Sequence, residues 1–184
     1  MHDVTEIRGL TRRISYQAAH DALTGLINRG EFERRLAETL EGGHGDSVNS
    51  VLCYMDLDRF KAVNDTCGHL AGDNMLREVA KLIRDQVRDS DFVARLGGDE
   101  FGMLLIRCPL DKARQIADDV CNAIRDYRFV WQDRIFTIGI SIGLVEVSRE
   151  SGTLKDLLSA ADSACYVAKQ QGRGRVHVYS ARDE

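Results

Sequence analysis

The segment Arg95-Leu96-Gly97-Gly98-Asp99-Glu100-Phe101-Gly102 places two glycines and two acids between two apolar runs. Residues 91–96 alternate loosely with a period of two, and residues 101–106 form an apolar run typical of a buried strand. The segment therefore predicts a β-hairpin whose turn is made by Gly97 and Gly98. Because glycine tolerates positive φ and lacks a Cβ atom, a ligand can approach this backbone while the adjacent carboxylates point towards it.

A Gly-Gly turn with acids at its tip is also common in hairpins that bind nothing, so the turn alone does not indicate a function. A second acidic cluster does. The apolar residues 51–55 are long enough for a buried strand and end in Asp56-Leu57-Asp58. Carboxylates at the end of a strand commonly hold a catalytic metal, and Mg²⁺ prefers oxygen ligands. Two converging acidic sources therefore predict a metal-dependent site.

Five blocks of the sequence occur in a recognisable order between about residues 20 and 180. They are residues 21–29 (DALTGLINR), residues 56–65 (DLDRFKAVND), Gly68-His69 with Gly72-Asp73, the Gly97–Gly102 segment, and residues 168–173 (AKQQGR). Together these blocks resemble the GGDEF domain, the catalytic domain of bacterial diguanylate cyclases. We therefore expect this domain over residues 20–184, preceded at residues 1–19 by a linker or signalling helix.

The order of expected elements indicates an α+β fold. A strand ends at Asp56, an amphipathic helix begins near Leu70, the hairpin follows, and helices are expected after Pro109 and around residues 154–165. Residues 134–147 read as one strand and residues 176–179 as a closing strand. This is a split βαββαβ plan, similar to ferredoxin-like and polymerase palm domains, with a central antiparallel sheet flanked by helices.

The N-terminal residues contain two weaker patterns. Residues 2–7 resemble the last strand of a PAS sensor domain. Ile7, Leu10, Ile14 and Gln17 have the spacing of a coiled-coil seam, which indicates either a signalling helix that pairs with another chain or a helix packed on its own domain.

Composition limits the possible functions. A chain of 184 residues, 43% hydrophobic and 29% charged, predicts one compact domain with a short appendage. The formal net charge of −4 gives no reason to expect a nucleic-acid partner. The five cysteines have neither CxxC nor zinc-like spacing and predict reduced thiols, and no run approaches transmembrane length. We expect a soluble, cytoplasmic domain, whose parent protein could still be membrane-attached or carry PAS and EAL domains.

The resemblance implies a metal site and a catalytic site that share residues. Two Mg²⁺ or Mn²⁺ ions per active half-site are expected on Asp56, Asp99, the Leu57 carbonyl and Glu100. Either Asp99 or Glu100 would accept the proton of the attacking hydroxyl. For Asp58, the sequence leaves open a metal role and a structural role as cap of the following helix.

The resemblance also implies substrate-binding positions for GTP. Asn64 and Asp73 match guanine-binding residues, whereas alone they would be a turn residue and an acid at a helix start. The cations that match triphosphate-binding positions are Lys61, Lys169 and Arg173, and alone the last two would only complement a helix dipole. Phe60, Gly97 and Gly98 complete the expected substrate-binding set.

Arg88-Asp89-Ser90-Asp91 is an RxxD sequence that ends five residues before Gly97. On its own it predicts an i,i+3 salt bridge at a helix end. At this offset it matches the family's inhibitory site for its own product, where an arginine can bind guanine O6 and N7 and an aspartate can accept from guanine N–H groups.

Two functional hypotheses follow. The first is an active diguanylate cyclase that condenses two GTP into cyclic di-GMP as a homodimer and is inhibited by its product. The second is a catalytically silent module that binds GTP or cyclic di-GMP and regulates a fused EAL phosphodiesterase. A palm-like transferase acting on nucleic acid is disfavoured by the acidic balance of the chain.

Overall fold

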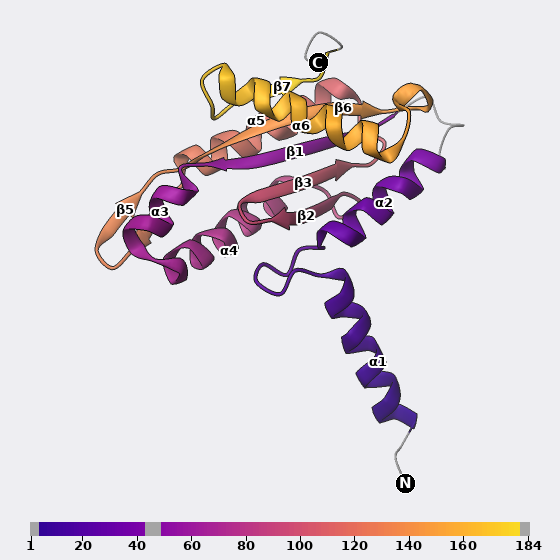
Figure 1. The fold of residues 1–184 in the computed structure, drawn as a ribbon, viewed down its shortest axis with the longest axis horizontal. Coiled ribbons are helices and arrows are strands. Elements are labelled where there is room, and N and C mark those ends of the chain that lie inside the picture. The colour runs from indigo at the N-terminus through magenta and orange to yellow at the C-terminus, as the bar shows by residue number, and fades with distance from the viewer. Residues whose placement is uncertain (1–3, 43–48, 181–184) are drawn as a thin grey trace.

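Strand β1 (Ser50–Asp58) forms the centre of a five-stranded sheet in the computed structural model, which describes residues 4–42 and 49–180 without the side chains of residues 4–7 and 149. The strand order is β2-β3-β1-β6-β7. On one side β1 pairs antiparallel with β3 (Glu100–Leu105), which pairs with β2 (Phe92–Gly97). On the other side it pairs antiparallel with β6 (Gly139–Val147), and β6 pairs parallel with β7 (Val176–Val178). Figure 1 shows β1 running through the middle of the domain.

Helices connect the strands of this sheet, which confirms the expected α+β fold. Helices α3 (Phe60–Cys67) and α4 (His69–Gln86) lead from β1 to β2, and α5 (Leu110–Asp126) follows β3. After β6 come the short 3₁₀ helix η1 (Arg149–Ser151) and α6 (Leu154–Gln170), which leads to β7.

The single strand expected over residues 134–147 is wrong, because the structure divides it. Strand β5 (Arg134–Phe136) leaves the main sheet and pairs only with β4 (Phe129–Trp131). Phe129 is buried and its ring lies 6.3 Å from the Phe136 ring, so this hairpin is anchored by its own aromatic pair.

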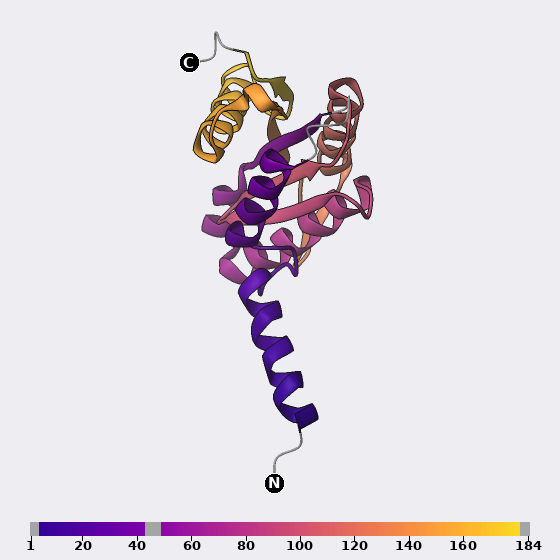
Figure 2. The ribbon, with the colours of Figure 1, turned by 90° about the vertical axis from the view of Figure 1, so that its right-hand side faces the viewer.

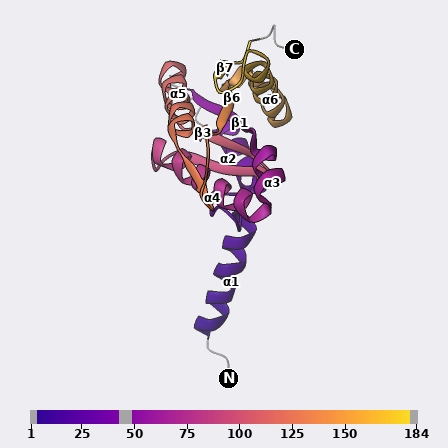
Figure 3. The same cartoon turned by 90° about the vertical axis from the view of Figure 1, so that its left-hand side faces the viewer.

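Alternating residues of β1 build two separate cores. Val51, Cys53 and Met55 face α4 and α5, whereas Leu52 and Tyr54 face α6 and α2 (Arg29–Glu41). Seen along the sheet, α5 and α6 lie on opposite faces (Figures 2 and 3). Both faces of β1 are therefore covered, and its polar residues are concentrated at its C-terminal end.

Helix α6 approaches β6 very closely at Gly143. A Cβ atom at this position would lie 2.2 Å from the backbone nitrogen of Cys165 and 2.5 Å from the carbonyl oxygen of Ala161. Only glycine permits this contact. This close contact fixes where α6 lies against β6. It therefore also fixes the position of Lys169, which follows one helical turn after Cys165.

Helix α1 (Val4–Ala19) extends away from the sheet (Figure 1). Leu10 and Ile14 are 59% and 58% exposed, so the alternative in which this seam packs on its own domain is wrong for these two residues. The expected PAS-like strand is also wrong for residues 4–7, which are helical; His2, Asp3 and the side chain of Ile7 lie outside the described residues. Within the described ranges, no helix is both long and apolar enough to span a bilayer.

Candidate active site

The turn between β2 and β3 depends on glycine as expected but lies one residue later than predicted, because Gly97 is the last residue of β2. Gly97 and Gly98 adopt φ values of 151° and 42°, and a Cβ atom at either position would meet nothing within 4 Å. Glycine is therefore required here by the backbone conformation rather than by lack of space. Gly98 and Asp99 form the turn, and Glu100 is the first residue of β3.

The Arg95 side chain stabilises this turn through a hydrogen bond to its backbone. Its Nε donates to the Gly98 carbonyl at 3.0 Å, and its Nη1 lies 3.2 Å from Oδ1 of Asp21. Asp21 also accepts from the backbone nitrogen and the hydroxyl of Thr24, at 2.9 and 2.7 Å. Asp21, Thr24 and Arg95 are thus positioning residues for which no sequence pattern predicts a role, although Asp21 and Thr24 belong to the first block of the resemblance.

Strand pairing brings the predicted metal-binding carboxylates to one end of the sheet. Asp56 is the register partner of Glu100, and the Leu57 nitrogen donates to the Asp99 carbonyl at 3.1 Å. Burial and the nearby Asp56 carboxylate raise the pKa of Asp99. Negative charge is therefore concentrated here, although among the described residues no three His, Cys, Asp or Glu side chains are grouped closely enough to form a metal site.

Lys169 supplies the opposite charge. Its Nζ donates to Oδ2 of Asp56, so it does more than complement the dipole of α6. Burial acts to lower the pKa of Lys169, but the hydrogen bond and charge of Asp56 outweigh it and raise this pKa. The ammonium group therefore stays protonated beside the carboxylates.

Asp58 does not cap α3, so of the two roles that the sequence leaves open for this residue the cap is wrong. The capping position is Arg59, which makes no side-chain capping bond. Asp58 is instead buried and accepts from the Ser141 hydroxyl at 3.1 Å and from the Gly174 nitrogen at 3.0 Å. It anchors the loop after α6, in which Arg173 lies with its Nη1 3.6 Å from Asp58 Oδ1.

Glu100 is fixed by two neighbours on the α2 face of the sheet. Arg29 Nη2 lies 3.6 Å from its Oε2, and Arg29 Nε also donates to the Leu96 carbonyl at 3.0 Å. Burial, followed by the hydrogen bond to Glu100, raises the pKa of Tyr54. The Glu100 carboxylate is therefore held by Arg29 and Tyr54 at the start of β3.

The two predicted guanine-binding residues lie together where α3 meets α4. Asn64 belongs to α3 rather than to a turn, and its Oδ1 is buried without a hydrogen-bond partner. A Cβ atom on Gly72 would lie 1.8 Å from this oxygen, so the amide packs directly against the residue before Asp73. A buried acceptor without a donor is costly, and no group of the described residues supplies a donor to this oxygen.

Two further predicted substrate residues, Phe60 and Lys61, belong to the same helix α3. Lys61 is exposed on α3, and Phe60 is partly buried and packs against the core. The structure thus places the predicted metal, guanine and phosphate residues at the C-terminal end of β1 and on the elements next to it.

Arg88 and Asp91 lie at the other end of the β2–β3 hairpin, away from this site. Asp91 is buried and accepts from the backbone nitrogens of Arg88 and Ile106, each at 3.0 Å. It also binds Arg88 Nε at 3.1 Å and Nη2 at 2.9 Å. The Arg88 side chain remains 48% exposed, so its guanidinium is held rigidly at the surface.

Sequence comparison identifies the protein family that has this arrangement of residues. The GGDEF profile, described as "Diguanylate cyclase, GGDEF domain", matches residues 18–175. This chain belongs to the GGDEF family. The expected identification is therefore confirmed.

Relatives and a solved structure of GGDEF proteins agree with this assignment. The chain is 47% identical over 179 residues to the probable diguanylate cyclase DgcE of Escherichia coli K12, a match that covers 97% of this chain and 16% of that protein. It is 32% identical to the cyclic di-GMP phosphodiesterase PdeB of Shewanella oneidensis, over 100% of this chain and 21% of that protein. The coiled coil and GGDEF domain of DgcB from Caulobacter crescentus, in complex with c-di-GMP, superposes with a TM-score of 0.89 at 27% identity, covering 95% of this chain and 93% of that one. The chain thus spans only a small part of the two curated relatives.

Proposed function

We propose that this GGDEF domain is a diguanylate cyclase, which condenses two GTP molecules into cyclic di-GMP and releases two pyrophosphates. The convergence of Asp56 and Asp99 with Lys169 at the end of β1 carries the proposal. Joining the nucleotides requires a 3′-hydroxyl to attack an α-phosphorus, and this chemistry depends mainly on positioning and charge neutralisation.

The donor types fit a divalent metal, although the described carboxylates would have to move closer together to hold it. Asp56, Asp99 and the Leu57 carbonyl offer oxygen ligands of the kind that Mg²⁺ or Mn²⁺ prefers, Glu100 adjoins them, and Asp56 already binds one cation, the Lys169 ammonium group. When bound, such ions would neutralise charge on the phosphates and acidify the attacking hydroxyl. Two ions per half-site remain our proposal.

The chain's own residues supply recognition and orientation. Asn64, whose buried oxygen has no donor within the described part of the protein, is proposed to read guanine N–H groups together with Asp73. Lys169, Arg173 and Lys61 provide positive charge for the triphosphate. One of the two acids of the turn, Asp99 or Glu100, accepts the hydroxyl proton.

Product analysis tests this proposal directly. The purified protein is incubated with GTP and Mg²⁺ over a range of protein concentrations, and the nucleotides are separated and identified. Cyclic di-GMP and pyrophosphate are expected in a ratio of one to two. The similarity to PdeB favours one alternative, a silent regulatory module, and GTP binding without any cyclic product would establish that alternative.

Catalysis is proposed to require a homodimer, because each chain supplies one guanine site and the product is two-fold symmetric. Helix α1, with Leu10 and Ile14 exposed, is the proposed contact. Replacing Leu10 and Ile14 together with serine should raise at least ten-fold the protein concentration at which specific activity is half-maximal, because each buried side chain of this size contributes about 1.5–3 kcal/mol. Activity at saturating protein concentration should recover.

The measurement combines specific activity with sedimentation equilibrium over the same concentrations. Arg12→Ser, which changes an exposed residue of α1 outside the seam, serves as the control and should behave as wild type. Constant specific activity on a demonstrated monomer would rule the dimer requirement out.

Product inhibition is proposed at Arg88. The Asp91 carboxylate is already bound by backbone and arginine N–H groups, and Arg88 Nη2 also donates to the Ile106 carbonyl at 2.7 Å. The role of Asp91 is therefore to orient the Arg88 guanidinium so that its Nη1 group can donate to guanine O6 and N7. Arg88→Ala should remove about 1–3 kcal/mol, weakening cyclic di-GMP binding about ten- to a hundred-fold. Calorimetry without Mg²⁺ measures this, with Arg114→Ala, which changes an exposed residue of α5, as control. If wild type and Arg88→Ala bind cyclic di-GMP with equal affinity, Arg88 and Asp91 form only a salt bridge at a helix end and no inhibitory site.

A further inference from the structure

A recess of about 520 Å³ beside the active site concentrates positive charge in an acidic chain. Its lining includes four arginines, Arg59, Arg125, Arg128 and Arg173, against two acids, Asp58 and Asp126. The whole chain has a formal net charge of −4, so this lining departs from the average surface. The guanidinium group binds phosphate through paired hydrogen bonds, which makes an arginine cluster suited to phosphate anions.

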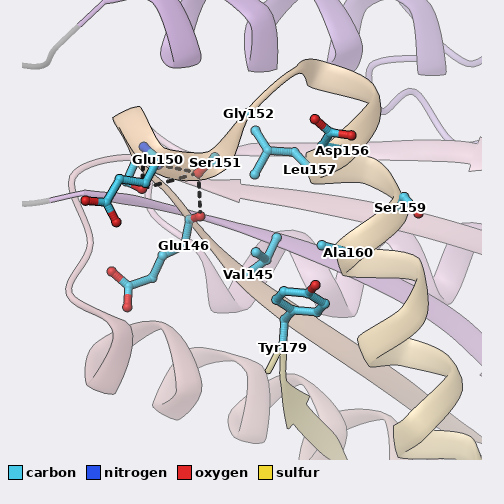
Figure 4. A pocket seen from close by; sticks show the side chains of 11 residues that line it. Val145, Glu146, Glu150, Ser151, Gly152, Asp156, Leu157, Ser159, Ala160 and Tyr179 are labelled. Atoms are coloured by element: carbon cyan, nitrogen blue, oxygen red, sulfur yellow. Dashed lines mark hydrogen bonds between the residues drawn. The ribbon is translucent and has the colours of Figure 1, made fainter. Parts of the chain in front are cut away.

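A second recess of about 530 Å³ at the other end of β6 provides a contrast. It is lined by Glu146, Glu150 and Asp156 with Tyr179, and Figure 4 shows these acidic side chains around its opening. Two hollows of similar size therefore carry opposite charge. The arginine cluster is therefore specific to the first recess, and the second recess does not share it.

Two of the four guanidinium groups are available to a ligand. Within the part of the chain that the structure describes, neither Arg59 nor Arg125 forms a side-chain hydrogen bond or ion pair. Arg59 adopts the left-handed conformation (φ 71°, ψ 11°) just before α3, which is unfavourable for a residue other than glycine. Arg128, in contrast, donates to the carbonyls of Arg125 and Asp126, at 3.3 and 3.2 Å, and closes the end of α5.

The two acids of the lining leave an excess of positive charge, because they face four arginines. Asp58 is buried, accepts from Ser141 and Gly174, and lies 3.6 Å from Arg173 Nη1, so it holds the loop that carries Arg173. Arg173 lines the recess and is also one of the cations proposed to bind the triphosphate. The recess therefore shares Arg173 with the phosphate end of the proposed GTP site.

We propose that this recess binds pyrophosphate released from the GTP site, with Arg59 and Arg125 as ligands in addition to Arg173. This inference rests on the proposed cyclase function, because that reaction supplies the pyrophosphate. Cleavage of the α–β phosphate bond leaves the product beside Arg173, and the unpaired guanidinium groups give it a binding position away from the carboxylates. No further bond is made or broken in the recess.

Calorimetry with sodium pyrophosphate tests the site on the full chain, without GTP and with divalent metal removed. Without metal, Asp56 and Asp99 repel the anion, so binding reports on the arginines. Arg125→Gln should weaken pyrophosphate binding at least ten-fold, since a charge-assisted bond to phosphate is lost. The matched control is Arg114→Gln, which removes the same charge from an exposed position on α5 and should change the affinity less than two-fold.

Arg59→Asn provides a second variant that keeps the fold, because asparagine tolerates the left-handed conformation. It should weaken pyrophosphate binding to a similar extent. Both variants should also raise the concentration of pyrophosphate needed to inhibit turnover. Unchanged affinity in Arg125→Gln and Arg59→Asn would overturn the proposal.

Separate titrations with pyrophosphate and with inorganic phosphate show which of the two anions the recess prefers. Inorganic phosphate should bind at least ten-fold more weakly than pyrophosphate, and equal affinities would overturn the assignment to pyrophosphate. If pyrophosphate binds through Arg125 while the wild type makes no cyclic di-GMP, the cyclase function fails and the anion site stands. The two failures are thereby distinguishable.

Discussion

We expect Asp99→Asn to reduce the turnover of GTP at least a thousand-fold while the domain remains folded. The carboxylate is proposed to hold metal beside Asp56, and its loss should remove about 4 kcal/mol or more of transition-state stabilisation. The backbone carbonyl of Asp99, which accepts from Leu57, is unchanged by the substitution. Quantification of cyclic di-GMP in initial-rate assays measures the effect.

The same variant gives a second, independent readout. Burial and Asp56 raise the pKa of Asp99, so the ionised carboxylate is disfavoured in the folded protein without metal. Replacing it with a neutral amide should leave the metal-free unfolding temperature unchanged or raise it. Loss of activity together with loss of stability would instead indicate a misfolded turn.

Asp85→Asn is the matched control, because Asp85 is exposed on α4 and outside the site. It should retain wild-type turnover. An Asp99→Asn protein with more than a tenth of wild-type activity would contradict the metal-binding role of Asp99 and with it the proposed mechanism.

The parts of the site that the sequence predicts are those that depend on local patterns. The glycine pair, the period-two run before it and the apolar strand ending at Asp56 each specify their own conformation. Antiparallel pairing then brings the strand end and the turn together, since Asp56 and Glu100 are register partners. Both acidic clusters are therefore predictable from the residues that immediately surround them.

The parts that the sequence misses depend on contacts between distant residues. Asp58 follows a strand and precedes a helix, so a cap is a reasonable expectation, but its partners Ser141 and Gly174 lie 83 and 116 residues away. The Arg95–Asp21 contact spans 74 residues and has no local signal in either segment. The division of residues 134–147 likewise results from the pairing of β5 with β4, which no periodicity within β5 predicts.

Gly72→Ala should lower kcat/KM for GTP about 10- to 100-fold, mainly by raising KM. The new Cβ atom would lie 1.8 Å from Oδ1 and 2.8 Å from Cγ of Asn64, so the amide must leave its present position, in which its oxygen is buried against Gly72 and from which it is proposed to read guanine. A guanine N–H group left unpaired costs about 1–3 kcal/mol. Alanine is more stable than glycine within a helix by roughly 0.5–1 kcal/mol. The substitution should therefore not unfold α4, and unfolding of α4 would not explain the loss of activity.

A double-mutant cycle with Asn64→Ala separates this mechanism from other effects of the new methyl group. The next nearest atom, Phe60 Cζ, lies 3.3 Å from the Cβ position, so Asn64 is the main obstacle. In the Asn64→Ala background, Gly72→Ala should therefore change kcat/KM less than two-fold, because the side chain that it displaces is already absent. Gly30→Ala, whose Cβ would lie 3.6 Å from its nearest neighbour, is the control and should have no effect. If Gly72→Ala costs as much without the Asn64 amide as with it, the substitution acts elsewhere and Asn64 is not the residue that reads guanine.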